Sequence, residues 1–415
     1  MAHIKPFKCI RPAEDKASKI AALPYDVYSS EEAKAKVHGD AYTFLRIDRA
    51  ETQFEEKIAV DDPRVYDKAR QILDNMIENG DFISDGEDKY YIYELTMNGR
   101  TQTGIVACAS IDDYCNNVIK KHENTREDKE LDRIRHVDVC NAQTGPIFLA
   151  YRSKAEINEV VNKTKNNKAV YDFVSDDGIR HRVWDIALAE DIQTIRDGFE
   201  AIENIYIADG HHRAASAVKV GLKRRKEQPE FMELTGEEEF NFFLSVLFPD
   251  EELMIMDYNR VVKDLNGYSL EQFMDKVKEN FDVECEGESQ VVPSKKGEMG
   301  MFVDGKWYRI NAKTDSMILD DPVKKLDVAI LQDYLLGPVL GIEDPRTDNR
   351  IAFIGGIRGL GELERRVNSD MKVAFAMYPT SIGELFDVAD KNMLMPPKST
   401  WFEPKLRSGL FIHSL

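Results

Sequence analysis

The alternation of short strand-like runs with amphipathic helical stretches is the feature that most limits how this chain can fold. Residues 63–79 open with a proline, which suits a first helical turn, and carry apolar side chains at helical spacing. Residues 90–96 and 102–111 have strand-like patterns and flank Asn98-Gly99, a pair typical of hairpin turns. Elements mixed in this order predict an α+β fold with mixed sheets and not a regular βαβ barrel.

The length of 415 residues exceeds the size at which one hydrophobic core keeps growing, so more than one domain is expected. We expect a main α+β domain over residues 1–264, within which residues 40–48 form a strand. Residues 265–320 have a helix and strands of their own and predict a small subdomain. Residues 321–415 return to alternating helix and strand and predict a C-terminal α/β segment that packs back on the main domain.

Composition narrows the function classes. Lys and Arg total 56 against 75 Asp and Glu, and the formal net charge of -19 argues against binding of nucleic acid, though not of a nucleotide. The sequence has no apolar run of membrane-spanning length and no secretory signal at its start, so a cytoplasmic protein without membrane contact is expected. The five cysteines form no CxxC pair, which fits reduced structural thiols, and they lack the ligand spacing of a structural zinc site.

One strand–turn–helix segment concentrates groups that handle anions. Residues 204–208 predict a short apolar strand, and the helix that follows begins near residue 211. Between them, Gly210 permits a tight turn and a close approach of a ligand to the backbone. The free N–H groups of the first helical turn, with His211, His212 and Arg213, would then bind a phosphate. Asp209 stands among these cationic groups, should stay ionised, and could hold Mg²⁺ or accept a hydroxyl proton.

A purely structural role and a metal site are the alternatives for this segment. In the structural role, Asp209 only caps the helix and the two histidines are surface residues, but four functional side chains within five residues favour chemistry. For the metal site, adjacent residues on a helix point about 100° apart, so His211 and His212 cannot chelate one ion as an i, i+4 pair would. One of them could still bind a metal with partners from elsewhere.

Three further segments carry groups suited to the same chemistry, although each alone also fits a solvated face, a cap or a turn. The charged run at residues 120–135 gains a functional interpretation only if it folds near Asp209. The candidates are His122, Glu123, Thr125 and Arg126 in this run, Asp26 after a Pro-Tyr pair, and Lys398, Ser399 and Thr400 after a Pro-Pro pair.

Together these segments resemble the family catalogued as domain of unknown function 1015. Its members share a Pro-Tyr-Asp near the start, a His-Glu-x-Thr, an Asp-Gly-His-His-Arg and a Pro-Pro-Lys-Ser-Thr near the end. Here the motifs stand in the same order at residues 24–26, 122–125, 209–213 and 396–400.

More distantly, the strand–turn–helix segment is similar to the ParB/sulfiredoxin superfamily, which includes the archaeal-type free serine kinases. The resemblance implies a ParB/sulfiredoxin-like core beside the smaller α/β region, a phosphate cradle from Gly210 to Arg213 and a catalytic Asp209. In those kinases an acidic residue of an early motif acts as the base, and Asp26 is the matching candidate. No helix-turn-helix region follows the turn, which weakens a ParB-like role on DNA.

The leading hypothesis is a Mg²⁺-dependent kinase that transfers phosphate from ATP or ADP to the hydroxyl of a small metabolite, with free L-serine as the first candidate. The alternatives are a ParB-like switch protein that binds CTP and a metal-dependent hydrolase. Partners would be a free amino acid and a nucleotide, and a homodimer stays open. In the kinase hypothesis the catalytic candidates are Asp209, Asp26 and His211; the nucleotide would meet Gly210, His212, Arg213, Thr125, Arg126, Lys398, Ser399 and Thr400; a metal would meet His122 and Glu123.

Overall fold

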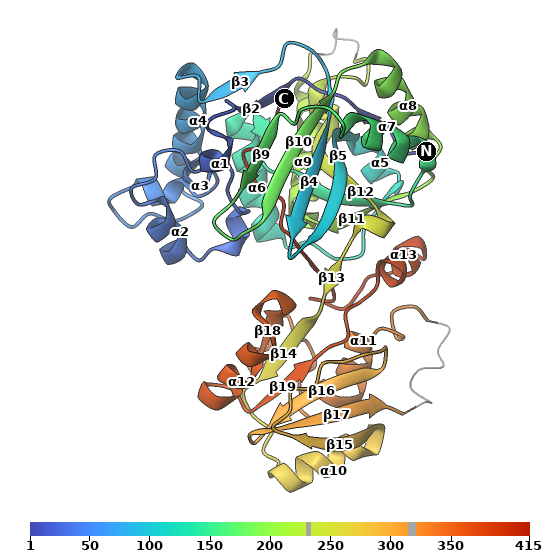
Figure 1. The fold of residues 1–415 in the computed structure, drawn as a ribbon. Helices are drawn as coiled ribbons and strands as arrows, with labels where there is room; N and C mark the ends of the chain where they lie inside the picture. The colour runs from blue at the N-terminus through green and yellow to red at the C-terminus, as the bar shows by residue number, and fades with distance from the viewer. Residues whose placement is uncertain (230–233, 314–320) are drawn as a thin grey trace. The chain divides into compact units, whose positions relative to one another are not determined.

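The computed structural model describes residues 1–229, 234–313 and 321–415. The chain folds into two compact units (Figure 1). The first unit holds Met1–Leu253 together with the final segment Pro404–Leu415, and the second holds Met254–Glu403. The chain therefore leaves the first unit once and returns to it for its last residues.

A nine-stranded mixed sheet forms the centre of the first unit, in the order β6-β11-β8-β12-β5-β4-β10-β9 with β1 paired to β5 (Figure 1). The pairs β6/β11 and β8/β12 are parallel and the others are antiparallel. The strands are β1 (Ile4–Lys5), β4 (Tyr90–Met97), β5 (Arg100–Ser110), β6 (Ile119–Lys120), β8 (Ile147–Tyr151), β9 (Tyr171–Val174), β10 (Arg180–Ile186), β11 (Ile205–Asp209) and β12 (Phe242–Pro249).

Both predicted features of the first hairpin are confirmed. β4 pairs antiparallel with β5, and Asn98 and Gly99 adopt the left-handed conformation at φ +51° and +79° that such a tight turn requires. The alternation along β4 then divides its side chains between two faces. Tyr90 and Ile92 join the apolar core beneath the helices, whereas Tyr93 contacts Phe411 on the opposite face.

Helices cover the core face of this sheet. The core contains side chains from β4, β5, β8 and β11 and from α7, α8 and α9. The predicted helix at residues 63–79 is confirmed as α4, where Asp62 caps the first turn by accepting the Arg64 N–H. The helices of the first unit are α1 (Ala17–Ile20), α2 (Ser30–Val37), α3 (Leu45–Asp48), α4 (Pro63–Glu78), α5 (Ile111–Cys115), α6 (Glu127–Cys140), α7 (Ala155–Thr164), α8 (Ala189–Glu200) and α9 (His211–Glu227).

A small four-stranded sheet anchors the end of the chain in the first unit. Its order is β3-β2-β21-β7, so the C-terminal strand β21 pairs with both β2 and β7. These strands are β2 (Cys9–Pro12), β3 (Phe82–Ser84), β7 (Ala142–Gln143) and β21 (Ile412–Ser414).

The second unit has a six-stranded sheet in the order β15-β17-β16-β19-β14-β18 and a two-stranded pair β13-β20. Its strands are β13 (Ile255–Met256), β14 (Tyr258–Val262), β15 (Phe281–Gly287), β16 (Glu298–Val303), β17 (Lys306–Ala312), β18 (Ile351–Gly355), β19 (Val373–Ala376) and β20 (Trp401–Phe402). Its helices are α10 (Leu270–Asn280), α11 (Asp327–Leu331), α12 (Leu360–Ser369) and α13 (Ile382–Asp390). No helix in the described parts of the chain is long and apolar enough to cross a membrane.

The division into units differs from the predicted one. Instead of a subdomain at residues 265–320 and a segment at residues 321–415, one sheet combines strands from both ranges. β14, which the sequence pattern placed in the main domain, lies between β18 and β19 in that sheet. The boundary between the two units depends on pairing between strands that are far apart in sequence. Local sequence patterns do not predict that pairing. Only residues 404–415 return to the first unit, and the predicted boundary at residue 320 falls beside residues outside the described ranges.

The predicted strand at residues 40–48 is wrong. Asp40 accepts hydrogen bonds from the N–H groups of Tyr42 and Thr43 at 2.9 and 3.1 Å, and the chain then enters the short helix α3. Such a side chain offers the backbone a turn in place of a ladder, and this local chemistry overrode the alternating pattern.

Buried His181 predicts an acid-labile first unit. Burial, with a smaller effect of Arg407, lowers the pKa of His181 to about 3 from its ordinary value of 6.5. Between these values the unfolded chain binds a proton that the folded chain does not, so stability falls as the pH drops from about 6.5. One such group contributes a slope of about 1.4 kcal/mol per pH unit.

Urea unfolding between pH 7 and pH 4 measures that slope. His181→Gln should reduce it by about one proton, whereas the same substitution at exposed His38 should leave it unchanged. An identical slope in both variants would contradict the assignment of a neutral buried His181.

Candidate functional site

Parallel pairing of β6 with β11 brings two of the motifs together. Ile119 and Lys120 pair with Ile205 and Tyr206. Parallel neighbours end at the same edge of a sheet, so the chain after β6 and the chain after β11 emerge side by side. The segment at residues 122–126 therefore lies against the turn at residues 209–213.

Two contacts join these segments directly. The Arg126 N–H donates to Nε2 of His212 at 3.0 Å, and the rings of His122 and His211 meet edge to face with 4.5 Å between their centroids. The sequence hypothesis made the role of the charged run depend on this proximity, and the structure supplies it. His212 thus holds the loop at residues 122–126 in addition to any contact with a ligand.

The turn between β11 and α9 has no side-chain cap. Gly210 adopts φ +92° and stands at the N-cap of the 17-residue helix α9. The first N–H groups of a helix have no partner within the helix, and the helix dipole favours an anion beside them. The guanidinium of Arg213 lies close to the glycine: a Cβ added at residue 210 would stand 3.0 Å from its Nη2. A glycine is therefore needed for both the backbone conformation and this close approach.

Asp209 lies within a cationic environment. Its Oδ1 accepts the Gly210 N–H at 2.9 Å, and its Oδ2 is 3.1 Å from Nζ of Lys405. Burial acts to raise the pKa of this carboxyl, but Lys405 and Arg213 outweigh it and hold the pKa well below its usual range. Asp209 is thus an anion at neutral pH, and it pairs with Lys405 beside the N-terminus of α9.

His122 and His211 are buried and neutral. Burial lowers the pKa of His122 to about 4, and burial followed by the nearby His122 lowers the pKa of His211 well below its usual range. Within the described residues, Nδ1 of His122 and Nε2 of His211 have no hydrogen-bond partner. Buried ring nitrogens without partners are rare in folded proteins, and a catalytic or ligand-binding role is one explanation for them.

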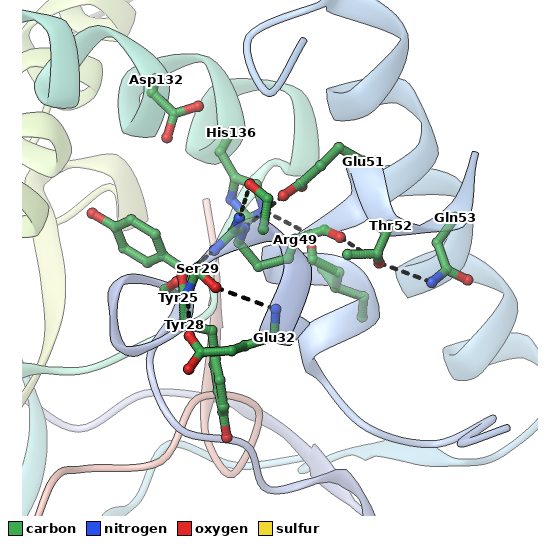
Figure 2. Close-up of polar contacts among 12 residues, drawn as sticks. Tyr25, Tyr28, Ser29, Glu32, Arg49, Glu51, Thr52, Gln53, Asp132 and His136 are labelled. Atoms are coloured by element: carbon green, nitrogen blue, oxygen red, sulfur yellow. Dashed lines mark hydrogen bonds and ion pairs between the residues drawn. The ribbon is translucent and has the colours of Figure 1, made fainter. Parts of the chain in front are cut away.

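The Pro-Tyr-Asp motif approaches the same region from a different part of the fold. The ring of Tyr25 lies 4.0 Å from the guanidinium of Arg133 in α6. Arg49 fixes the loop from its other side by donating to the carbonyls of Tyr25 and Tyr28 at 3.1 and 2.7 Å (Figure 2). Asp26 is exposed on the single 3₁₀ turn Tyr25–Val27 that these contacts hold in place.

A cavity of about 40 Å³ lies between residues of two of the motifs and helix α6. Pro24 and Tyr25 line it on one side, Arg133 of α6 on another, and Arg213 of α9 on a third. Residues of two motifs separated by almost two hundred residues in sequence thus line one cavity. This convergence is the main observation for a shared site in the first unit.

The remaining predicted residues have mixed positions. Thr125 donates its hydroxyl to Glu130, and Arg126 pairs with Asp128 at 2.9 Å on the surface. Lys398, Ser399 and Thr400 belong to the second unit, where Arg260 donates to the Lys398 carbonyl at 3.0 Å. Lys398 adopts φ +58°, which is rare for a residue with a side chain. The role of these residues toward a nucleotide stays a prediction.

Sequence patterns missed several residues around the site. Lys405 follows the last motif by five positions, and only its return to the first unit brings it to Asp209. Arg133 lay within the charged run but had no assigned role, and Arg49 and Asp48 had none either. For Arg133 the charge of the run was the available signal, because its contacts depend on how α3 and the 3₁₀ turn Tyr25–Val27 lie against α6.

The donor set fits a magnesium ion better than zinc. No group of three or more His, Cys, Asp or Glu side chains in the described ranges is placed to hold a metal. Mg²⁺ usually keeps water and substrate phosphates and takes only one or two carboxylates from the protein. Asp209 is such a carboxylate beside the open helix end, with Glu123 in the adjoining loop as a second candidate. The neutral, buried His122 is a poor magnesium ligand, because this ion prefers oxygen.

Comparison with known proteins gives a family and several distant structures. The family model described as "Protein of unknown function (DUF1015)" matches residues 4–329. A free serine kinase mutant in complex with AMP is similar with a TM-score of 0.34 and 13% identity, covering 74% of this chain and 92% of that one. A C-terminally truncated SbnI from Staphylococcus aureus has a TM-score of 0.38 and 9% identity, covering 73% and 85%.

A conserved hypothetical protein from Pyrococcus furiosus is similar at a TM-score of 0.32 and 13% identity, covering 74% of this chain and 94% of that one. No curated protein sequence matches the chain. The chemistry of the site therefore follows from its own residues.

Gly210→Ala should separate backbone strain from loss of the anion site. The left-handed conformation at φ +92° costs an L-residue about 1–2 kcal/mol, and the new methyl group would displace Arg213. Gly178→Ala is the matched control, since Gly178 has φ +78° but nothing within 4 Å of the added Cβ.

Thermal unfolding should show similar losses of stability in both variants. Titration with pyrophosphate and ADP should show weaker binding only in Gly210→Ala. Equal affinities in the two variants would mean that the turn does not bind phosphate.

Proposed function

The chain belongs to the DUF1015 family, and we propose that it is a nucleotide-dependent kinase that phosphorylates the hydroxyl of a small metabolite, with free L-serine as the first candidate. The observation that carries the proposal is the open N-terminus of α9 at Gly210, bordered by the Asp209–Lys405 ion pair and by Arg213. Phosphoryl transfer depends mainly on positioning and on charge neutralisation, and this turn offers both.

Each group has a defined task in this proposal. The first N–H groups of α9, together with Arg213 and Lys405, would bind the terminal phosphates of ATP or ADP. A magnesium ion bound with the nucleotide would neutralise phosphate charge, with Asp209 as its protein carboxylate. Arg126 and Thr125 would border the nucleotide from the adjoining loop, which His212 holds in place.

The transfer itself forms one bond and breaks one. The hydroxyl oxygen of the acceptor attacks the terminal phosphorus, and the bond from that phosphorus to the bridging oxygen breaks, which releases the shortened nucleotide. The hydroxyl proton passes to a carboxylate. Lys405 and Arg213 outweigh the effect of burial and hold the pKa of Asp209 well below its usual range, so Asp209 is a weak base and the exposed Asp26 is favoured as the proton acceptor. Asp209 would then organise the cations.

The direct test is incubation of the full-length protein with Mg²⁺, L-serine and either ATP or ADP, followed by mass spectrometry for O-phosphoserine. We expect a product that depends on both nucleotide and amino acid. No product with any nucleotide, combined with selective binding of CTP, would instead support the switch-protein alternative.

Asp209→Asn should abolish most turnover while the fold persists. The amide keeps an oxygen for the Gly210 N–H but loses the charge that orients Lys405 and Arg213, so kcat should fall by about 100-fold or more. Asp185→Asn is a close control, because Asp185 pairs with Lys89 at 2.9 Å with a side-chain exposure of 39%, against 36% for Asp209.

Steady-state kinetics and thermal unfolding of both variants provide the readout. Near-normal kcat in Asp209→Asn would show that this carboxylate has only a structural role.

A further inference from the structure

The cavity between the 3₁₀ turn Tyr25–Val27, α6 and α9 has a charge pattern that a phosphate site alone does not explain. Two arginines, Arg133 and Arg213, line it, and so does Asp48 at the end of α3. Asp48 is only 6% exposed, and its Oδ1 accepts a hydrogen bond from the Thr144 hydroxyl at 3.2 Å. Residues of both charges thus line one cavity.

We infer that this cavity binds the backbone of a free amino acid, with Arg133 and Arg213 on its α-carboxylate and Asp48 on its α-ammonium. The inference rests on the proposed function and assigns the phosphoryl acceptor to a place in the fold. Its ligand class is a small zwitterion with a hydroxyl group.

The two arginines are fixed for a carboxylate. Asp132 engages Nε and Nη2 of Arg133 at 2.9 and 2.8 Å, and the Tyr25 ring stacks on the same guanidinium. Nη1 of Arg213 donates to the Pro146 carbonyl at 2.7 Å. A guanidinium has five N–H donors, so each group keeps donors beyond these contacts. Planar groups held in this manner bind carboxylates well because little side-chain freedom is lost.

Asp48 is suited to an ammonium. A carboxylate has about four lone-pair sites, and Thr144 uses one of them. His136, which also lines the cavity, adds no positive charge at neutral pH, because burial and then Arg133 lower its pKa to about 4. His136 therefore does not compete with a bound ammonium group for Asp48. The ammonium group of an amino acid would offset the negative charge of Asp48.

The size of the cavity limits the side chain of the amino acid. The cavity volume of about 40 Å³ has room for about three water molecules. Three water molecules occupy a volume similar to that of a three-carbon amino acid. Larger side chains would have to displace buried residues such as Leu244 and His136 that form the wall. Arg213 borders both the cavity and the turn at Gly210, so an amino acid bound here would lie next to the phosphate-binding donors.

Gly145→Ala tests the location by filling the cavity without changing any charge. Gly145 lines the cavity, and an added Cβ would stand 3.1 Å from the Ser408 hydroxyl and 3.6 Å from Nη1 of Arg213. Its backbone is outside the left-handed region, so alanine brings no backbone strain. Gly86→Ala is the control in the same unit, with nothing within 4 Å of the new methyl group.

Isothermal titration of the full-length protein gives the readout, with L-serine and ADP titrated separately. Gly145→Ala should weaken L-serine binding by at least about tenfold and leave ADP binding within about twofold, a difference of about 1.4 kcal/mol for L-serine. Gly86→Ala should leave both affinities unchanged. Unchanged L-serine affinity in Gly145→Ala would place the amino acid elsewhere and overturn the inference.

Chemical variants of the ligand test the charge assignment independently of any mutation. L-Serinamide lacks the carboxylate and N-acetyl-L-serine lacks the ammonium, so both should bind far more weakly than L-serine. Asp48→Asn retains an oxygen for the Thr144 hydroxyl and should reduce L-serine binding alone. Equal binding of the three compounds would contradict a zwitterion site.

The outcomes also distinguish this inference from the proposed function. Binding of ADP without binding of any amino acid would reject the inference and leave the nucleotide site standing. Binding of neither ligand would reject both.

Discussion

The short parallel pairing of β6 with β11 is the constraint on which the candidate site depends. Two residue pairs, Ile119 with Ile205 and Lys120 with Tyr206, set the register. Because the strands run in the same direction, the loop at residues 122–126 and the turn at residues 209–213 emerge at one edge of the sheet. The edge-to-face contact of His122 with His211 and the bond from the Arg126 N–H to His212 follow from that register.

Charge balance is the second principle of the site. The backbone end of α9 supplies partial positive charge, and Lys405 and Arg213 add full charges around Asp209. The carboxylate of Asp209 stabilises this cationic group in the absence of an anion and orients it toward the turn. A nucleotide phosphate would provide the negative charge that the helix end lacks. The same balance recurs at the cavity, where Arg133, Arg213 and Asp48 combine both signs in a small volume.

Local chemistry made part of this architecture predictable. Asn98-Gly99 specified its hairpin because the turn needs two left-handed residues, and Gly210 indicated the strand–turn–helix junction for the same reason. The anion-binding character of residues 209–213 could also be stated, since the groups that create it are adjacent in sequence. The predicted strand at residues 40–48 was wrong, because apolar periodicity does not register the turn that the Asp40 side chain forms with the N–H groups of Tyr42 and Thr43.

Long-range pairing was the part that the sequence could not provide. The units divide where β14 joins β18 and β19, and no local pattern encodes that choice of partners. Lys405 reaches Asp209 only because the chain returns from the second unit at residue 404. Asp48 and Arg133 come together through packing of α3 and α6. Their roles as proposed ligands therefore could not be inferred from spacing.

A crystal structure of the protein with ADP and Mg²⁺ would decide whether the first turn of α9 binds a nucleotide. We predict that the terminal phosphate lies within hydrogen-bond distance of the backbone N–H groups of His211 and His212, with Lys405 and Arg213 beside it. A nucleotide bound elsewhere in the protein, with the first turn of α9 free of phosphate, would contradict the proposed site.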